Sequence, residues 1–206
     1  MNVPRTLVFV ALGDSLTAGF TPYLTDPDIP YTTYLQDLAS TEQSGNPTEQ
    51  IKCTFVNLGV NGDDARRMIE RMVTDVAPRE PDYVIVWGGI NDLLIGRAPI
   101  HVMESLEQMY LMAREQSIEP IACTLTSVTY QGVIISRIME LNGLIRHYCA
   151  ENRIRLADLF KALSNESGLL LEEYSSDGLH LNNNGNKRIA DTVYSEVINF
   201  ILLNVR

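Results

Sequence analysis

Residues 7–16 read Leu-Val-Phe-Val-Ala-Leu-Gly-Asp-Ser-Leu, an unbroken apolar run that passes into a small turn and a serine. Six consecutive apolar residues are typical of a strand that is buried on both faces of a parallel sheet. A Gly-Asp-Ser turn after such a strand places a hydroxyl at the carboxyl edge of the sheet, where open α/β folds bind ligands. Because no cleavage-type segment separates the run from the turn, we expect a core strand rather than a secretory signal, and a cytoplasmic protein.

Further along the chain, apolar runs rich in β-formers alternate with segments of helical periodicity. Strands are predicted at residues 7–12, 54–58, 83–87, 121–125 and 155–157, and helices at 64–76, 102–115, 138–152 and 185–203. This alternation predicts a parallel sheet with helices on both faces, which is a three-layer α/β/α sandwich. A length of 206 residues suits one domain, residues 1–206, and no linker-like stretch interrupts it.

Four short motifs carry chemically useful side chains, and three of them lie at the C-terminal ends of predicted strands. They are Gly13-Asp14-Ser15-Leu16, Asn57-Leu58-Gly59-Val60-Asn61-Gly62, Gly89-Ile90-Asn91-Asp92 and Asp177-Gly178-Leu179-His180. A serine hydroxyl becomes an effective nucleophile when an imidazole takes its proton and a carboxylate fixes the imidazole tautomer. Ser15, His180 and Asp177 fit these roles. The Gly62 amide and the Asn91 side-chain amide fit the donors that stabilise an oxyanion.

In these motifs the chain resembles the GDSL-type serine esterases and lipases of the SGNH hydrolase superfamily, from about residue 7 to the C-terminal helix. The resemblance implies the flavodoxin-like strand order 2-1-3-4-5. It implies Ser15 as nucleophile, His180 as general base and Asp177 as its partner, with the amides of Ser15 and Gly62 and the Asn91 side chain forming the oxyanion hole. It further implies hydrolysis of small or short-acyl esters through an acyl-enzyme, as in acetylesterases, arylesterases, lysophospholipases or thioesterases, without cofactor or metal.

The chain departs from the family pattern at two positions. Asp63 stands beside Gly62 where many relatives carry a small hydroxyl residue, so Gly59 stays an alternative to Gly62 as the oxyanion donor. Leu181 follows His180 where many relatives have proline, which should change the stiffness of the loop more than its chemistry.

Each motif also has a purely structural interpretation. Ser15 would be a helix N-cap, Asn91 and Asp92 would cap the segment after the third strand, and Asp177 would cap a turn before the last helix. A ligand-binding module that has kept the fold and lost turnover is therefore the alternative function. A flavodoxin-like nucleotide-binding protein is disfavoured because the chain has neither a GxGxxG motif nor a P-loop.

His180 is one of three histidines. His147 lies within a helical run, and His101 lies near a helix start with no carboxylate at comparable spacing, so a histidine base is expected at position 180. The Gly-x-Ser-x-Gly signature of another hydrolase architecture is absent, because Thr17 stands two residues after Ser15.

Charge and composition restrict the partners. A net charge of −10 disfavours nucleic acid, and the one basic cluster, Arg66, Arg67 and Arg71, is expected to be a solvated helix face paired with Glu70 and Asp75. The apolar runs are too short to cross a bilayer. The cysteines at positions 53, 123 and 149 form no ligand pattern and are expected to be reduced core thiols. The oligomeric state is left open.

The substrate is expected to meet three loops at the crevice, residues 21–34, 126–136 and 164–176. Apolar and aromatic side chains in these loops, Tyr23, Leu24, Tyr31, Tyr34, Tyr130, Val133 and Ile134, suit a modest apolar or sugar-bearing pocket. The same side chains would equally serve to pack the loops onto the domain.

Overall fold

The computed structural model describes residues 5–22, 29–41 and 51–204. A sheet of five parallel strands forms its centre, in the order β2-β1-β3-β4-β5. The strands are β1 (Thr6–Gly13), β2 (Lys52–Gly59), β3 (Tyr83–Trp87), β4 (Glu119–Cys123) and β5 (Arg155–Ala157). The order 2-1-3-4-5 and the parallel arrangement confirm the predicted fold.

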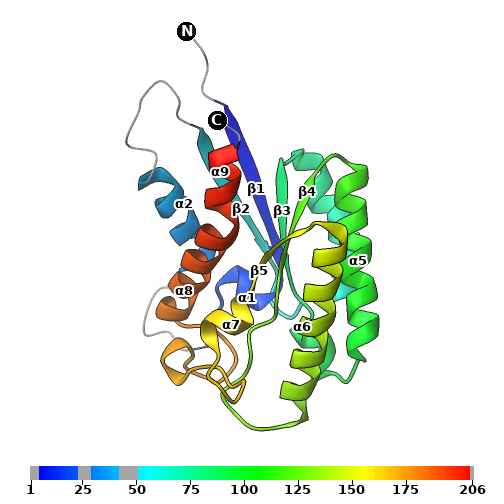
Figure 1. Ribbon diagram of the computed structural model, residues 1–206, viewed down its shortest axis with the longest axis vertical. Coiled ribbons are helices and arrows are strands. Elements are labelled where there is room, and N and C mark those ends of the chain that lie inside the picture. Colours follow the sequence, from blue (N-terminus) through cyan, green and yellow to red (C-terminus); the bar gives the residue numbers. More distant parts are fainter. Residues whose placement is uncertain (1–4, 23–28, 42–50, 205–206) are drawn as a thin grey trace.

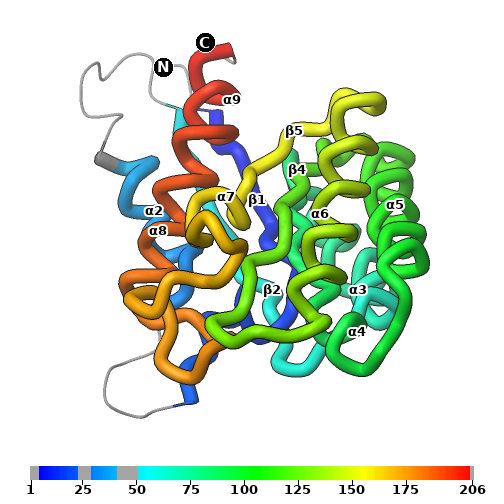
Figure 2. Tube along the Cα trace, turned by 60° about the horizontal axis from the view of Figure 1, so that its bottom comes forward, coloured from blue at the N-terminus to red at the C-terminus, as the bar shows by residue number. Residues whose placement is uncertain are grey.

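Helices cover both faces of this sheet (Figure 1). On one side lie α2 (Tyr31–Thr41), α8 (Asn183–Val193) and α9 (Asn199–Asn204), and on the other lie α3 (Ala65–Arg71), α5 (Pro99–Glu115) and α6 (Val133–Asn152). Figure 2 shows the same two groups of helices from a second direction. The sandwich therefore has three layers, α/β/α.

Shorter helical segments complete the fold. The helices α1 (Ser15–Ala18), α4 (Ile90–Leu94) and α7 (Leu159–Leu163) directly follow β1, β3 and β5 at the carboxyl edge of the sheet. Single π-helical turns at Met72–Val76 and Tyr194–Ile198 continue α3 and α8, and short 3₁₀-helices lie at Ala77–Arg79 and Glu172–Tyr174.

The central position of β1 fixes the place of the first motif. Its Phe9 ring stacks between Phe55 of β2 and Tyr83 of β3, with ring centroids 4.9 and 4.8 Å apart. The last five residues of β1 are all buried, as expected for a strand covered on both faces. The turn after β1 is thus anchored on a strand with neighbours on either side.

Most predicted elements lie where the sequence placed them, and the boundaries differ. β3 and β5 match, whereas β4 begins and ends two residues before the predicted 121–125. α6 begins at Val133 rather than at 138, and α5 begins at Pro99, where proline favours the first helical position.

The prediction of a loop over residues 21–34 is wrong at its end, because α2 begins at Tyr31. Tyr31 is fully buried with its ring edge against Trp87, at a centroid distance of 5.6 Å, so it belongs to the core and not to a substrate pocket. Tyr23 and Leu24, also assigned to that pocket, lie outside the described residues.

Candidate active site

Ser15 is the first residue of α1, directly after the turn that ends β1. The N-cap of this helix is Asp14, whose Oδ1 accepts the Leu16 amide at 2.9 Å. The interpretation of Ser15 as an N-cap is therefore wrong, and its hydroxyl is left for other contacts. Gly13 makes the tight approach possible, because a Cβ at this position would collide with the main-chain oxygen of Trp87.

His180 and Asp177 come to Ser15 from a turn near the other end of the chain. The Ser15 Oγ lies 3.1 Å from the His180 Nε2, and the His180 Nδ1 lies 2.6 Å from the Asp177 Oδ2. The structure thus brings together the three residues predicted from the sequence, in the order hydroxyl, imidazole, carboxylate. This is the contact pattern of a nucleophile, a base and the group that orients the base.

The Asp177 carboxylate also holds its own turn. Its Oδ1 accepts the backbone amides of Leu179 and His180 at 2.9 and 2.7 Å. Although burial acts in the opposite direction, the hydrogen bonds from the His180 side chain and these two amides lower the pKa of Asp177. The structural interpretation of Asp177 as a turn cap is therefore correct alongside its contact with the imidazole.

Two residues that the sequence did not single out support the His180 turn. The Ser175 hydroxyl donates to the His180 carbonyl at 2.7 Å and accepts the Gly178 amide at 3.0 Å. The Phe20 ring packs edge-on against the imidazole at a centroid distance of 4.9 Å. Neither residue belongs to a recognisable local pattern, so only the tertiary structure reveals their contacts.

Asn91 lies inside α4 and does not cap it. The N-cap is Gly89, at φ 115°, so the capping interpretation of Asn91 is wrong. Its Nδ2 donates to the Asp63 main-chain oxygen at 2.8 Å. A side-chain amide carries two N–H bonds, so this contact orients the amide and leaves one donor for another acceptor.

The two glycine candidates differ in how their amides are used. The Gly59 amide donates to the Asn57 Oδ1 at 2.8 Å, and a Cβ at Gly59 would collide with the backbone of Ala18. Gly62 has φ 74°, is exposed, and has nothing within 4 Å of a Cβ position. Its amide has no acceptor among the residues that the structure describes, which supports Gly62 as the donor.

A buried layer of carboxylates and arginines lies behind these motifs. Asp14, Asp63 and Asp92 have side chains that are almost inaccessible to solvent. Asp63 pairs with Arg71 at 2.6 Å and Asp92 with Arg97 at 2.8 Å. Burial, with further repulsion from Asp63 and Asp92, raises the pKa of Asp14 to about 7.

Arg71 corrects the expectation of a solvated basic face. Arg66 and Arg67 are exposed, but the Arg71 side chain is only 14% exposed. It pairs with Asp75 as predicted, at 2.9 Å, and also with Asp63. Glu70, the other expected partner, takes part in no ion pair within the described parts of the chain.

The other histidines lie on the surface. His101 pairs with Glu104 at 2.9 Å, so the expectation that no carboxylate stands at comparable spacing is wrong. Both side chains are more than half exposed, and His147 is exposed on α6, so neither histidine has the partly buried setting of His180.

The cysteines are buried and form no disulfide. Burial raises the pKa of Cys149 to about 12 and also raises the pKa of Cys123, so both are held as neutral thiols.

Within residues 5–22, 29–41 and 51–204, no cluster of histidine, cysteine and carboxylate side chains is suited to a metal ion. Over the same ranges, no helix combines the length and apolar character needed to span a bilayer.

Comparison with known proteins identifies the family of the chain and relates its fold to solved structures. The model of the GDSL-like Lipase/Acylhydrolase family matches residues 11–188, so the chain belongs to this family. Among solved structures, a lipase/acylhydrolase from Enterococcus faecalis is 22% identical with a TM-score of 0.75, over 94% of this chain and 96% of that chain. An acetyl xylan esterase, AlAXEase, has the same identity and TM-score over 93% and 100%. At this identity, the similarity to both structures shows the fold.

The match to a curated relative covers a smaller share of both proteins. An N-acylneuraminate cytidylyltransferase of Streptococcus agalactiae serotype III is 30% identical over 99 residues, which is 48% of this chain and 24% of the relative. The chain thus matches about a quarter of the length of these curated relatives.

Proposed function

We propose that the chain hydrolyses small or short-acyl carboxylic esters through an acyl-enzyme on Ser15. The observation that carries this proposal is the hydrogen-bond chain from the Ser15 Oγ through the His180 imidazole to the Asp177 carboxylate. A hydroxyl so placed can lose its proton to Nε2 while it attacks, and the carboxylate stabilises the imidazolium that results.

In the first half of the reaction, the Ser15 Oγ bonds to the ester carbonyl carbon and its proton moves to the His180 Nε2. The negative charge that develops on the carbonyl oxygen is stabilised by the amides of Ser15 and Gly62 and by the free N–H of the Asn91 side chain. Collapse of this intermediate breaks the bond to the alcohol oxygen, which takes the proton from Nε2. Water then repeats the sequence on the acyl-enzyme and releases the acid and the Ser15 hydroxyl.

The preference for a short acyl group is supported by the acetyl xylan esterase among the structural neighbours. The hollow of about 350 Å³ that Thr129, Leu170 and Glu172 border is not lined by Ser15, His180 or Asn91, so its volume does not bear on the size of the substrate.

A labelled fluorophosphonate tests the nucleophile. The wild-type protein should be labelled once and lose esterase activity, whereas Ser15→Ala should fold normally, escape labelling and lose most hydrolysis. Ser195→Ala, which removes an exposed hydroxyl from the C-terminal helical segment, is the matched control and should behave as wild type. Near-normal turnover by Ser15→Ala would refute the mechanism.

A panel of p-nitrophenyl esters from acetate to octanoate, with one O-acetylated sugar, tests the substrate class. We expect kcat/KM to fall as the acyl chain lengthens. Labelling by the fluorophosphonate without turnover of any of these esters would favour a ligand-binding module that has lost activity.

A further inference from the structure

We infer that Arg71 is a positioning residue of the oxyanion hole, because its guanidinium ties the carboxyl ends of β1 and β2 to the segment that carries Gly62 and anchors Asn91. This inference rests on the oxyanion roles proposed above for Gly62 and Asn91. Arg71 itself is not expected to touch the substrate.

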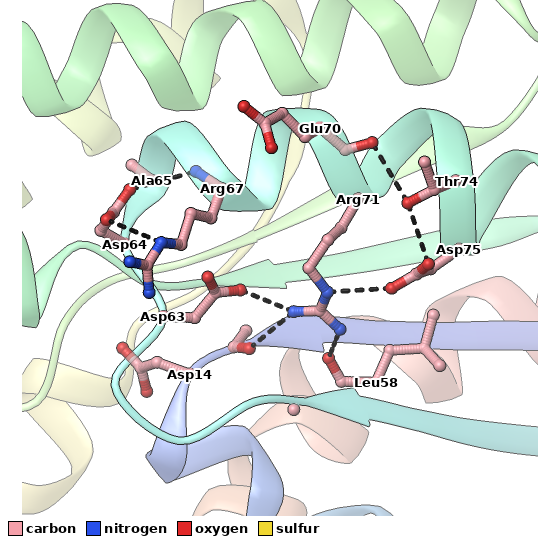
Figure 3. Close-up of polar contacts among 12 residues, drawn as sticks. Asp14, Leu58, Asp63, Asp64, Ala65, Arg67, Glu70, Arg71, Thr74 and Asp75 are labelled. Carbon is pink, nitrogen blue, oxygen red and sulfur yellow. Dashed lines mark hydrogen bonds and ion pairs between the residues drawn. The ribbon is translucent and has the colours of Figure 1, made fainter.

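The guanidinium has acceptors from four parts of the chain (Figure 3). Nη1 donates to the Asp63 Oδ2 at 2.6 Å and to the Gly13 carbonyl at 3.4 Å, and Nε donates to the Asp75 Oδ2 at 2.9 Å. Nη2 donates to the Leu58 carbonyl. One side chain therefore links the strand end that precedes Ser15, the neighbouring strand end and the segment that follows Gly62.

Asp63 connects the Arg71 ion pair to both proposed oxyanion donors. It is bonded directly to Gly62 in the chain, so the direction of the Gly62 amide depends on where Asp63 is held. Its own main-chain oxygen accepts the Asn91 Nδ2 at 2.8 Å, and its amide donates to the Val60 carbonyl at 3.1 Å. A shift of Asp63 would thus move the glycine amide and the asparagine amide together.

Burial makes the Arg71–Asp63 ion pair a strong constraint. The Asp63 side chain is 2% exposed and that of Arg71 is 14% exposed, unlike the surface pair between Arg67 and Asp64. Removing one partner of a buried pair leaves an unpaired charge, and the chain must move to solvate it. Here the segment that would move is the one between Gly62 and the start of α3.

The geometry calls for arginine and not only for a positive charge. A planar guanidinium donates in several fixed directions, which suits carbonyl and carboxylate acceptors spread around one plane. A lysine ammonium at the same position has its three donors on one atom and cannot reach all of these acceptors. Arg71→Lys therefore keeps the charge and removes the cross-link.

The test compares Arg71→Lys with Arg146→Lys by steady-state kinetics on p-nitrophenyl acetate, well below the thermal midpoint of each variant. Arg146, in the C-terminal half of α6, pairs with Asp158 through two hydrogen bonds of 2.8 Å, so its replacement also breaks a multiply bonded arginine pair. We expect Arg71→Lys to lower kcat about tenfold or more with little change in KM, as for groups that act in the transition state. Arg146→Lys should leave kcat unchanged.

Phenylboronic acid supplies a readout that a merely structural role would not move. Its boron bonds to the serine oxygen, and one boronate oxygen then occupies the oxyanion position. Arg71→Lys should weaken inhibition by phenylboronic acid by a factor close to its loss in kcat. Unchanged inhibition with normal kcat would overturn the inference, as would equal kcat losses in the two lysine variants.

Asp63→Asn keeps the backbone of the oxyanion segment and removes the carboxylate, so it repeats the test if Arg71→Lys fails to fold. The double variant of Asp63→Asn and Arg71→Lys should lose no more kcat than the worse single variant. Both substitutions break the same ion pair between Arg71 and Asp63, so their effects on kcat should not add. Losses in kcat that multiply in the double variant would overturn the inference.

Two outcomes separate this inference from the proposed function. If Ser15→Ala keeps its activity, the proposed function fails. If Ser15→Ala is inactive and Arg71→Lys has normal kcat, only the inference about Arg71 fails.

Discussion

Asp14 provides a stability prediction with a defined sign and size. Its carboxyl is fully buried beside two other carboxylates, and its Oδ2 has no hydrogen-bond partner among the described residues. Asp14→Asn replaces this group with a neutral amide of similar shape whose oxygen can still cap α1 through the Leu16 amide. We expect the variant to become progressively more stable than the wild-type protein as the pH rises.

The magnitude follows from the linkage between proton binding and folding. The pKa of Asp14 is raised from 3.8 to about 7 in the folded state. The folded state therefore holds a proton that the unfolded state has lost, and the stability from this group, complete below 3.8, falls as the pH rises to about 7. Between about pH 5 and about pH 8 the wild-type protein should lose about 3 kcal/mol relative to Asp14→Asn.

Urea unfolding of both proteins across this pH range measures the difference. Asp64→Asn is the control, because Asp64 caps α3 in the same way but is partly exposed and paired with Arg67. This control should show no comparable gain in stability with pH. A constant difference between wild type and Asp14→Asn from about pH 5 to about pH 8 would refute the assignment of a buried, proton-holding carboxyl.

Three further outcomes are expected. Asn91→Ala should lower kcat by about a hundredfold with little change in KM, because the oxyanion role proposed for its amide acts only in the transition state. A destabilised protein with normal kcat would contradict this role. Asp177→Asn should lower kcat by about a thousandfold or more, since an amide no longer favours the productive tautomer of His180. Comparing the kcat of the variant with that of the wild-type protein checks this outcome. Hydrolysis should persist after dialysis against EDTA, since neither the proposed nucleophile nor the base needs a metal; loss of activity that zinc restores would exclude the mechanism.

The order of strands and helices along the chain could be predicted because the strands have a recognisable apolar sequence pattern. A strand buried on both faces is apolar throughout, so β1 and β3 are visible as short runs bounded by Gly and Asp. Glycine turns at their carboxyl ends then mark the edge where the motifs meet. Helix starts were harder to predict, because α6 begins beside Gly132 with no capping side chain.

The candidate site also contains residues that the sequence predicts and one that it does not. Ser15, His180, Asp177 and Asn91 stand in recognisable local motifs, and the structure brings the first three into contact. Arg71 could not be recognised, because along the helix it looks like one more member of a basic surface cluster. Its burial depends on the approach of Gly13 and Leu58, which are distant in the chain, and no local periodicity encodes that approach.

The hydrogen bond between Ser15 and His180 joins residues 165 positions apart, nearly the whole length of the described chain. Closing a loop of this size costs conformational entropy before the contact returns any stabilisation, so contacts of this kind tend to form late in folding. Ester turnover during refolding would therefore report the arrival of the C-terminal segment against an already assembled sheet. A lag between the recovery of helical signal and the recovery of hydrolysis would time that last docking step, with the enzyme serving as its own folding probe.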